Sequence, residues 1–146
     1  MLLQTIFCID SPKYREIASY SKTLKLFETR NIPSSIPDSL YKTIIITSKR
    51  AIHPLTLQNQ SSRIYCIGKS IQEELLKSNI KSRGFETGNA LELANLVIKE
   101  NDYIDSRLIL LLNGDKRLDT LPNMLSNAGI PFKEICVSIS IFIIGY

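Results

Sequence analysis

Residues 63–75 read RIYCIGKSIQEEL, a short apolar strand followed by a glycine turn and the start of a helix. Gly68 permits a tight turn, and Ser70 with Glu73 three residues later predicts a capping box. The free backbone N–H groups at such a helix start favour an anion beyond the end of the strand. The stretch therefore predicts a strand-turn-helix joint with an anion-binding edge.

The same joint recurs along the chain at intervals of about twenty residues, which is the spacing of βαβ units. Residues 44–46 are three consecutive isoleucines, as expected for a strand covered on both faces in the middle of a parallel sheet. We therefore expect an α/β fold, with a flavodoxin-like parallel sheet flanked by helices on both faces. Strands are predicted near residues 43–47, 63–67, 82–85, 107–112 and 132–137.

Helix boundaries are predicted from capping residues. Ser48 should cap a short helix that stops before Pro54, and Asn89 with Glu92 three residues later should cap another. A third helix carries Leu121, Met124, Leu125 and Ala128 at apolar spacing and should end at Gly129.

The predicted domain organisation has three parts. Residues 1–38 form a partial first α/β domain of strand, helix and strand, residues 39–138 a complete flavodoxin-like domain, and residues 139–146 an apolar tail. Pro33 and Pro37 make residues 31–39 an extended linker between the two units. The apolar tail offers a surface for self-association.

Composition limits the function classes. The 146 residues are 44% hydrophobic and carry 18 basic against 14 acidic side chains, a net charge of +4 without a basic run. This balance favours a soluble globular protein with a small anionic ligand over a nucleic-acid partner. The longest apolar run, residues 135–146, is shorter than the roughly twenty residues that a membrane span needs. We expect a cytoplasmic protein without a membrane partner.

No catalytic constellation is visible in the sequence. Cys8, Cys66 and Cys136 lie in apolar runs and are interpreted as buried, reduced thiols without zinc-ligand spacing. His53 is interpreted as a surface residue next to a helix end. Residues 68–70 resemble the end of a phosphate loop, but Arg63 stands where that loop needs glycine, which excludes a nucleotide P-loop.

The strand ends should gather along one edge, because all strands of a parallel sheet end on the same side. Several turns there place a lysine or arginine beside a helix start, where the helix dipole disfavours a cation unless an anion is bound. The competing interpretation is that these are ordinary solvated side chains. The predicted binding residues are Thr47, Ser48, Lys49, Gly68, Lys69, Ser70, Asn89, Gly114 and Lys116. No residue is assigned as catalytic.

The dispersed pattern of residues resembles the uroporphyrinogen-III synthase family. Residues 44–52, IIITSKRAI, resemble the family's strand followed by Thr-Ser and, two residues later, a small and an apolar residue. Residues 64–68 with Leu75 resemble its Val-Gly strand end and the following helix. Residues 110–114 with Leu121, Leu125 and Gly129 resemble its leucine-rich strand, glycine turn and helix, and residues 88–90 with Leu93 its capped helix.

This resemblance implies a cofactor-free lyase of tetrapyrrole and heme biosynthesis that closes hydroxymethylbilane with inversion of ring D. It also implies a bilobed chain in which the first domain is built from both chain ends, with the substrate held between the lobes. Residues 1–38 would then be the opening piece of the first domain, whose closing half is missing here. The chain is therefore expected to be a truncated or divergent member.

Two positions depart from the family pattern. Ile71 stands where the family usually has threonine, and Ser138 where a tyrosine usually ends the fifth strand. These departures leave an alternative open, a non-catalytic flavodoxin-like domain that binds anions or a partner and was left by truncation.

Overall fold

The computed structural model of the protein describes residues 27–32, 36, 41–55, 62–101, 108–115 and 118–142. The chain divides into two compact units, one of residues 1–30 with 140–146 and one of residues 31–139. The second unit holds most of the described elements and all of those discussed below as a functional site. The strand and helix predicted before residue 24 lie outside the described residues.

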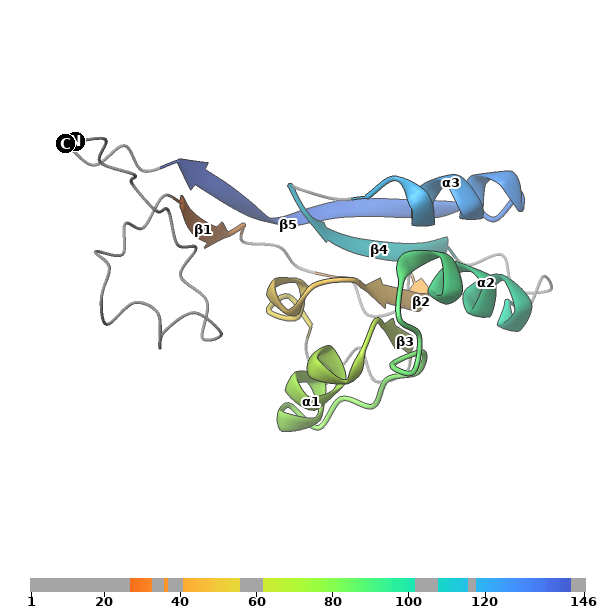
Figure 1. The fold of residues 1–146 in the computed structure, drawn as a ribbon, viewed down its shortest axis with the longest axis horizontal. Helices are drawn as coiled ribbons and strands as arrows, with labels where there is room; N and C mark the ends of the chain where they lie inside the picture. Colours follow the sequence, from red (N-terminus) through yellow and green to blue (C-terminus); the bar gives the residue numbers. More distant parts are fainter. Residues whose placement is uncertain are drawn as a thin grey trace, which may run out of the picture. The chain divides into compact units, whose positions relative to one another are not determined.

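A five-stranded sheet forms the centre of the fold (Figure 1). Its strands are β1 (Phe27–Asn31), β2 (Tyr41–Ile46), β3 (Arg63–Cys66), β4 (Leu108–Gly114) and β5 (Phe132–Phe142), in the order β1-β5-β4-β2-β3. Strand β2 pairs in parallel with β3 and β4, and β4 pairs in parallel with β5. The predicted α/β fold with a parallel sheet is confirmed.

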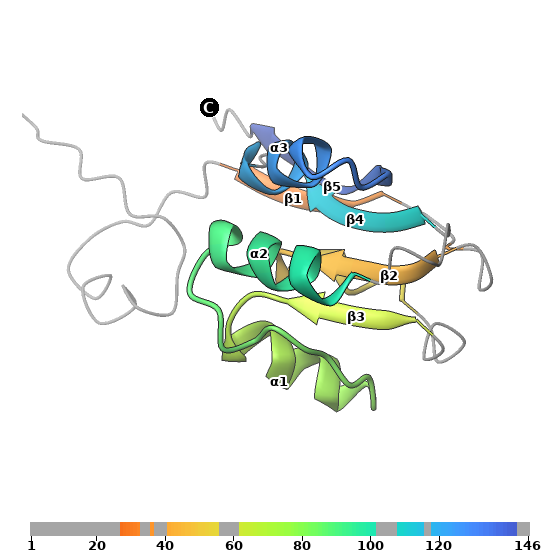
Figure 2. The same cartoon turned by 90° about the vertical axis from the view of Figure 1, so that its right-hand side faces the viewer.

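Helices cover both faces of this sheet, as predicted. The short 3-10 helix η3 (Lys49–Ala51) and helix α1 (Lys69–Lys77) contribute Ala51, Ile71 and Leu75 to one buried cluster. Helices α2 (Ala90–Glu100) and α3 (Thr120–Asn127) contribute to a second cluster and lie side by side on the same face (Figure 2).

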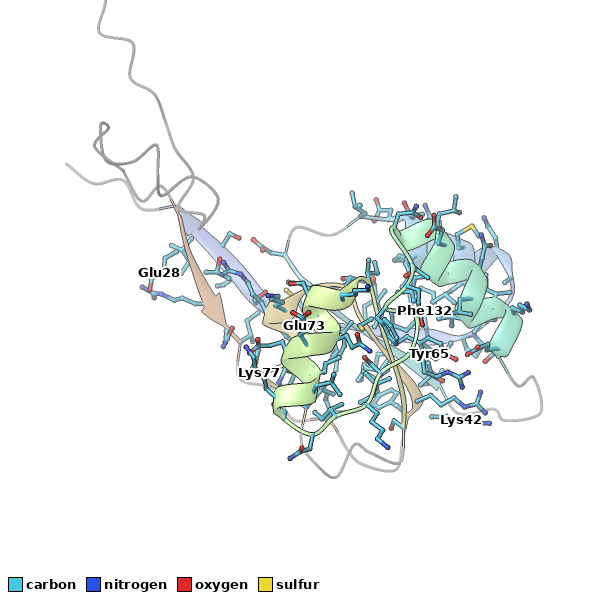
Figure 3. All side chains as sticks on the ribbon, turned by 60° about the horizontal axis from the view of Figure 1, so that its bottom comes forward. Glu28, Lys42, Tyr65, Glu73, Lys77 and Phe132 are labelled. Carbon is cyan, nitrogen blue, oxygen red and sulfur yellow. The ribbon has the colours of Figure 1, made fainter. Side chains whose placement is uncertain are left out.

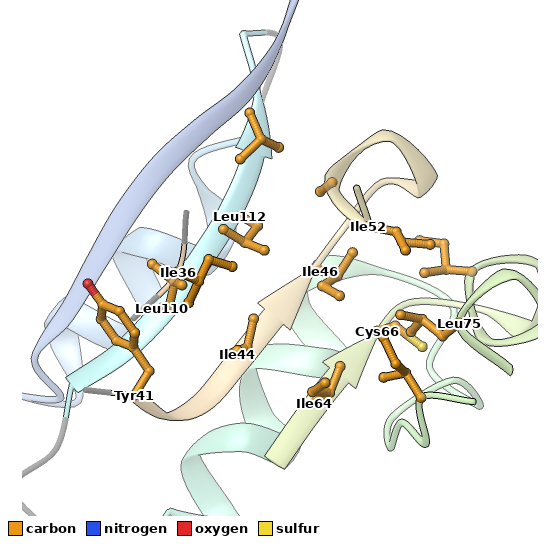
Figure 4. Close-up of a cluster of buried hydrophobic side chains, with 14 residues drawn as sticks. Ile36, Tyr41, Ile44, Ile46, Ile52, Ile64, Cys66, Leu75, Leu110 and Leu112 are labelled. Carbon is orange, nitrogen blue, oxygen red and sulfur yellow. The ribbon is translucent and has the colours of Figure 1, made fainter. Parts of the chain in front are cut away.

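The two clusters follow from the alternation of side chains along the central strands. Ile44 and Ile46 of β2 point to the α1 face, and Ile45 between them points to the α2 and α3 face. All three are fully buried, which explains why the strand is apolar throughout. Figure 4 shows the α1-face cluster, in which side chains of three neighbouring strands lie side by side: Leu110 and Leu112 of β4, Ile44 and Ile46 of β2, and Ile64 and Cys66 of β3.

The predicted strand at residues 82–85 is reduced to a single parallel bridge between Arg83 and Tyr65. The Arg83 N–H donates to the Ile64 carbonyl at 2.8 Å, and the Cys66 N–H donates to the Arg83 carbonyl at 2.9 Å. The Arg83 segment pairs with β3 on the side away from β2, at the outer edge of the sheet. In a flavodoxin strand order this third strand of the domain would lie between β2 and β4. The strand order therefore departs from the flavodoxin order in this one respect. Gly84, with a φ of 76°, turns the chain away after one bridge.

The start of helix α1 also differs from the prediction. The helix begins at Lys69, with Gly68 at the N-cap position and no side-chain cap, so the capping box of Ser70 with Glu73 is wrong. Gly68 has a φ of 75°, which lets the turn close two residues earlier than a serine cap would. The caps predicted at Ser48 and Asn89 are confirmed, and so is the end of α3 at Gly129, where φ is 69°.

The expected linker and tail are described in part. Ile36 is buried in the α1-face cluster, while residues 33–35 and 37–40 lie outside the described residues. Strand β5 runs on to Phe142, so the first residues of the expected tail continue a strand. The domain boundaries at residues 38 and 138 stay a prediction.

The cysteines behave differently from one another. Cys66 is buried and free, as predicted, and burial raises the pKa of its thiol. Cys136 is exposed, which corrects the prediction, because its side chain lies on the opposite face of β5 from the buried Val137. Cys8 lies outside the described residues.

A polar network fastens the end of α2 to the edge of the sheet. The Tyr65 hydroxyl donates to the Glu100 carboxylate at 2.5 Å, and Arg83 pairs with the same carboxylate at 3.1 Å. Arg63 donates to the Glu100 backbone carbonyl at 3.1 Å. Burial, followed by the hydrogen bond to Glu100, raises the pKa of Tyr65 to about 12.

Two glycines with positive φ provide a matched pair of packing substitutions. A Cβ at Gly84 would lie 2.6 Å from a methyl carbon of the fully buried Leu93, whereas a Cβ at Gly129 would meet nothing within 4 Å. Gly84→Ala should lower the free energy of unfolding by about 2–4 kcal/mol, and Gly129→Ala by about 1–2 kcal/mol. Urea unfolding of both variants checks this, and equal losses would contradict the packing assigned to Gly84.

Tyr65 gives a prediction for alkaline pH. Its pKa is raised in the folded state, so its stabilising effect is complete below pH 10.0, the ordinary pKa, and is lost as pH rises through about 12. Tyr65→Phe should lower the free energy of unfolding by about 1–2 kcal/mol at neutral pH, and this difference should shrink above pH 10. Glu100→Gln is the control, because it should lower the raised pKa while keeping the tyrosine. Tyrosinate absorbance during alkaline titration reads out both variants, and an unchanged titration in Glu100→Gln would contradict the network.

Candidate functional site

The carboxyl ends of β2, β3 and β4 meet at one edge of the sheet, here called the carboxyl edge. Ile46 is in register with Cys66 on one side and Leu112 on the other. Thr47 and Ile67 follow the ends of β2 and β3 directly, whereas β4 continues through Asn113 to Gly114. The turns after β2 and β3, which carry Thr47 to Lys49 and Gly68 to Ser70, therefore begin next to each other.

The N-terminus of α1 is the part of the carboxyl edge best suited to an anion. Gly68 provides no side-chain cap, the first turn contains no acidic residue, and Lys69 and Ser70 are exposed. The backbone N–H groups of this first turn therefore point past the end of β3 without a carboxylate from the helix itself. A bound carboxylate would accept from these N–H groups and lie next to the ammonium group of Lys69.

The turn after β2 adds a second cation on the same side of the sheet. Ser48 accepts a hydrogen bond from the Arg50 N–H at 3.3 Å, and this cap starts η3 with Lys49 exposed. Lys77 lowers the pKa of Glu74 through a 2.8 Å hydrogen bond. The charge of Lys49, on the neighbouring η3, lowers the pKa of Glu74 to a smaller extent. Lys49 thus lies within electrostatic range of Glu74 on α1, in agreement with the packing of η3 against that helix.

The N-terminus of α2 has the opposite character. The Asn89 side-chain oxygen accepts from the Glu92 N–H at 2.9 Å, and its amide donates to the Glu92 carboxylate at 3.0 Å. The other oxygen of that carboxylate accepts from the Gly88 N–H at 2.8 Å. This helix start is already occupied by a carboxylate of its own, so Asn89 acts as a cap. Its predicted role as a ligand contact remains untested.

The turn after β4 is described in part. Gly114 pairs with Ser138 of β5, and a Cβ at Gly114 would lie 3.0 Å from the Ser138 hydroxyl. The glycine therefore permits the close approach of the two strands, which explains its presence without a ligand. Lys116 lies outside the described residues.

A polar chain of three side chains lies next to these turns and was not predicted. The Thr47 hydroxyl donates to the Asn113 side-chain oxygen at a long 3.5 Å, and the Asn113 amide donates to the Glu134 carboxylate at 3.0 Å. Asn113 is only 4% exposed. The signal available in the sequence was an asparagine that continues the apolar strand residues 108–112 at a position where the strand is still covered.

Other features of the described residues lie away from this edge or support no site. His53 is exposed, as predicted, and its Nε2 lies 2.8 Å from the Val137 carbonyl oxygen. A cavity of about 220 Å³ near the end of α1 is lined by Ser62, Ile64, Asn79, Ile80 and Lys81. Among the described residues there is no cluster of metal-ligating side chains, and no helix is both long and apolar enough to cross a membrane.

Known proteins were compared with the chain at the level of structure and of curated sequence. The chain is similar in fold to the crystal structure of uroporphyrinogen-III synthetase from Helicobacter pylori 26695, with a TM-score of 0.63 and 18% sequence identity. The match covers 88% of this chain and 59% of that chain, so the chain spans well under two thirds of the bacterial protein. A comparison with curated proteins gave no match.

A comparison with family models gave a more specific result. Residues 23–137 match the model described as Uroporphyrinogen-III synthase HemD. The matched range contains strands β1 to β4, every helix of the described part of the chain and every predicted binding residue. The chain therefore belongs to the uroporphyrinogen-III synthase family.

Proposed function

We propose that the carboxyl edge of this chain binds hydroxymethylbilane, the linear tetrapyrrole polycarboxylate that the family closes into uroporphyrinogen III. The observation that carries this proposal is the start of α1, whose first-turn backbone N–H groups have no side-chain cap and where Lys69 is exposed, with Lys49 exposed on the neighbouring η3. A ligand with eight carboxylates has enough charge to engage several such positions at once. The proposed place of action is the cytoplasm, within heme biosynthesis.

The proposed reaction needs no cofactor from the protein. The substrate loses its hydroxyl group to give an azafulvene, which is attacked through a spiro intermediate before the ring closes with ring D inverted. The unassisted substrate closes without inversion, so the protein contributes mainly by holding the chain of pyrroles in one shape. Lys49, Lys69 and the first-turn N–H groups of α1 would hold carboxylates, and no side chain is proposed as general acid.

The 146-residue chain is expected to bind better than it turns over. Ile71 is 7% exposed and packs in the α1-face cluster, so the usual family hydroxyl is absent at that position. Ser138 is 3% exposed and abuts Gly114, so its hydroxyl is used in packing where the family usually has a tyrosine. Because the chain spans 59% of the bacterial protein, we expect weak or no ring inversion unless a further lobe is supplied.

The alternative function is a non-catalytic domain that binds anions or a partner. The same buried Ile71 favours it, since loss of a hydroxyl is compatible with binding and unfavourable for catalysis. A turnover assay with hydroxymethylbilane separates the two functions. Formation of the inverted isomer above the spontaneous background supports the enzyme, and binding without it supports the alternative.

The same charge reversal, made at each end of α1 in turn, tests the proposed binding site at the carboxyl edge. Lys69 lies in the first turn of α1, at the carboxyl edge. Lys77, labelled in Figure 3, lies in the last turn of the helix. It already pairs with Glu74 at 2.8 Å. Lys69→Glu should weaken the binding of a linear tetrapyrrole polycarboxylate by about tenfold or more, and Lys77→Glu by less than about twofold. Calorimetric titration of both variants measures the difference. Equal affinities would mean that the carboxyl edge is not the binding site.

Salt dependence gives an independent check. Binding held largely by charge-assisted contacts should weaken steadily as ionic strength rises from about 0.05 to 0.5 M, because the Debye length falls below the spacing of the charges. The Lys69→Glu variant should show a shallower salt dependence than the unmodified chain. An affinity that does not change with salt would contradict a carboxylate-binding role for the lysines.

A further inference from the structure

The hydrogen bonds that link Thr47, Asn113 and Glu134 have a fixed donor and acceptor at each step, because the side chains differ in what they can donate. Glu134 faces Leu111 across β4 and β5, yet its carboxylate reaches Asn113, two residues nearer the carboxyl edge. An ionised carboxylate only accepts hydrogen bonds, so the group that Asn113 turns toward Glu134 must be its amide nitrogen. The amide oxygen of Asn113 therefore faces Thr47.

This orientation decides what the Thr47 hydroxyl can offer to a ligand. The Asn113 oxygen has no proton, so the hydroxyl proton of Thr47 points toward it. A hydroxyl has one proton and two lone pairs, so the half-buried Thr47 oxygen keeps only acceptor capacity for a group beyond the strand end. Thr47 in this state suits an N–H or O–H donor and does not suit a carboxylate.

The acceptor oxygen of Thr47 and the ammonium group of Lys69 belong to opposite faces of the sheet. Side chains two residues apart along a strand point to the same face of the sheet. Thr47 therefore shares the face of Ile45, and Asn113 that of Leu111, which is the face covered by α2 and α3. Lys69 starts α1, whose buried residues Ile71 and Leu75 pack on the other face. The carboxyl edge thus presents cations on one face and a hydrogen-bond acceptor on the other.

We infer that Asn113 and Glu134 are positioning residues that make Thr47 an acceptor for a pyrrole N–H, while the α1 side of the same edge holds carboxylates. The inference rests on the proposed function and adds which part of the ligand each face takes. It predicts a ligand that lies across the end of the sheet and carries both carboxylates and N–H donors. A polyanion without N–H donors would engage the α1 side alone.

Two probes separate the two faces. One is a linear tetrapyrrole polycarboxylate without the reactive hydroxymethyl group, and the other is benzenehexacarboxylate, which has carboxylates and no N–H. Thr47→Val should weaken binding of the tetrapyrrole by about tenfold and leave benzenehexacarboxylate unchanged, because only the former uses the lost acceptor. Thr47→Ser keeps the hydroxyl and should stay within about twofold for both probes.

The positioning role is tested without altering Thr47. In Glu134→Gln the new amide can donate, so Asn113 is free to turn over and direct its own amide at Thr47. Tetrapyrrole affinity should fall about threefold to tenfold while benzenehexacarboxylate affinity holds. The side-chain amide resonances of Asn113 should shift in this variant, which shows whether the hydrogen bond was present in the unmodified chain.

The outcomes distinguish the inference from the function on which it rests. The inference would be overturned if Thr47→Val or Glu134→Gln changed the affinity for both probes equally or for neither. Binding that depends on Lys69 would remain intact in that case. Failure of the unmodified chain to bind the tetrapyrrole, or an unchanged affinity in Lys69→Glu, would overturn the proposed function itself. If Thr47→Val does not fold, Glu134→Gln still decides, since glutamine keeps the size and shape of glutamate and leaves Thr47 unaltered.

Discussion

The cover on both faces of the parallel sheet is the constraint on which the rest of the structure depends. Because helices bury the two faces of β2 and β4, residues 44–46 and 109–112 must be apolar without interruption. Polar side chains can then appear only where the strands leave this cover. Parallel strands leave it together, and so the polar groups of distant turns are concentrated at the carboxyl edge.

Local patterns predicted what depends on local interactions. The isoleucines of β2, the cap at Asn89 and the glycine after α3 each act within a few residues, and the structure has them where expected. The start of α1 was misplaced because a glycine with positive φ and a serine cap predict starts two residues apart. The outer position of the Arg83 segment depends on tertiary pairing with Tyr65, and no local pattern carries that information.

The candidate site was predicted in the same uneven way. Turns with Lys49 and Lys69 were found because basic residues beside helix starts are a local signal. The contact of Thr47 with Asn113 joins residues 66 apart in sequence, and that of Asn113 with Glu134 joins residues 21 apart. Asn89 satisfied a local rule so well that its side chain is used in capping, which gives it less to offer a ligand than its position suggested.

We propose that ligand binding takes place at the carboxyl edge of residues 31–139. Mapping backbone amide shifts by NMR during titration with a linear tetrapyrrole polycarboxylate tests this most directly. We expect the largest shifts at Thr47, Ser48 and residues 69–71, with little change at Arg63 and Lys81 near the opposite ends of the strands. Shifts concentrated at Arg63 and Lys81, or spread evenly over both ends, would contradict it.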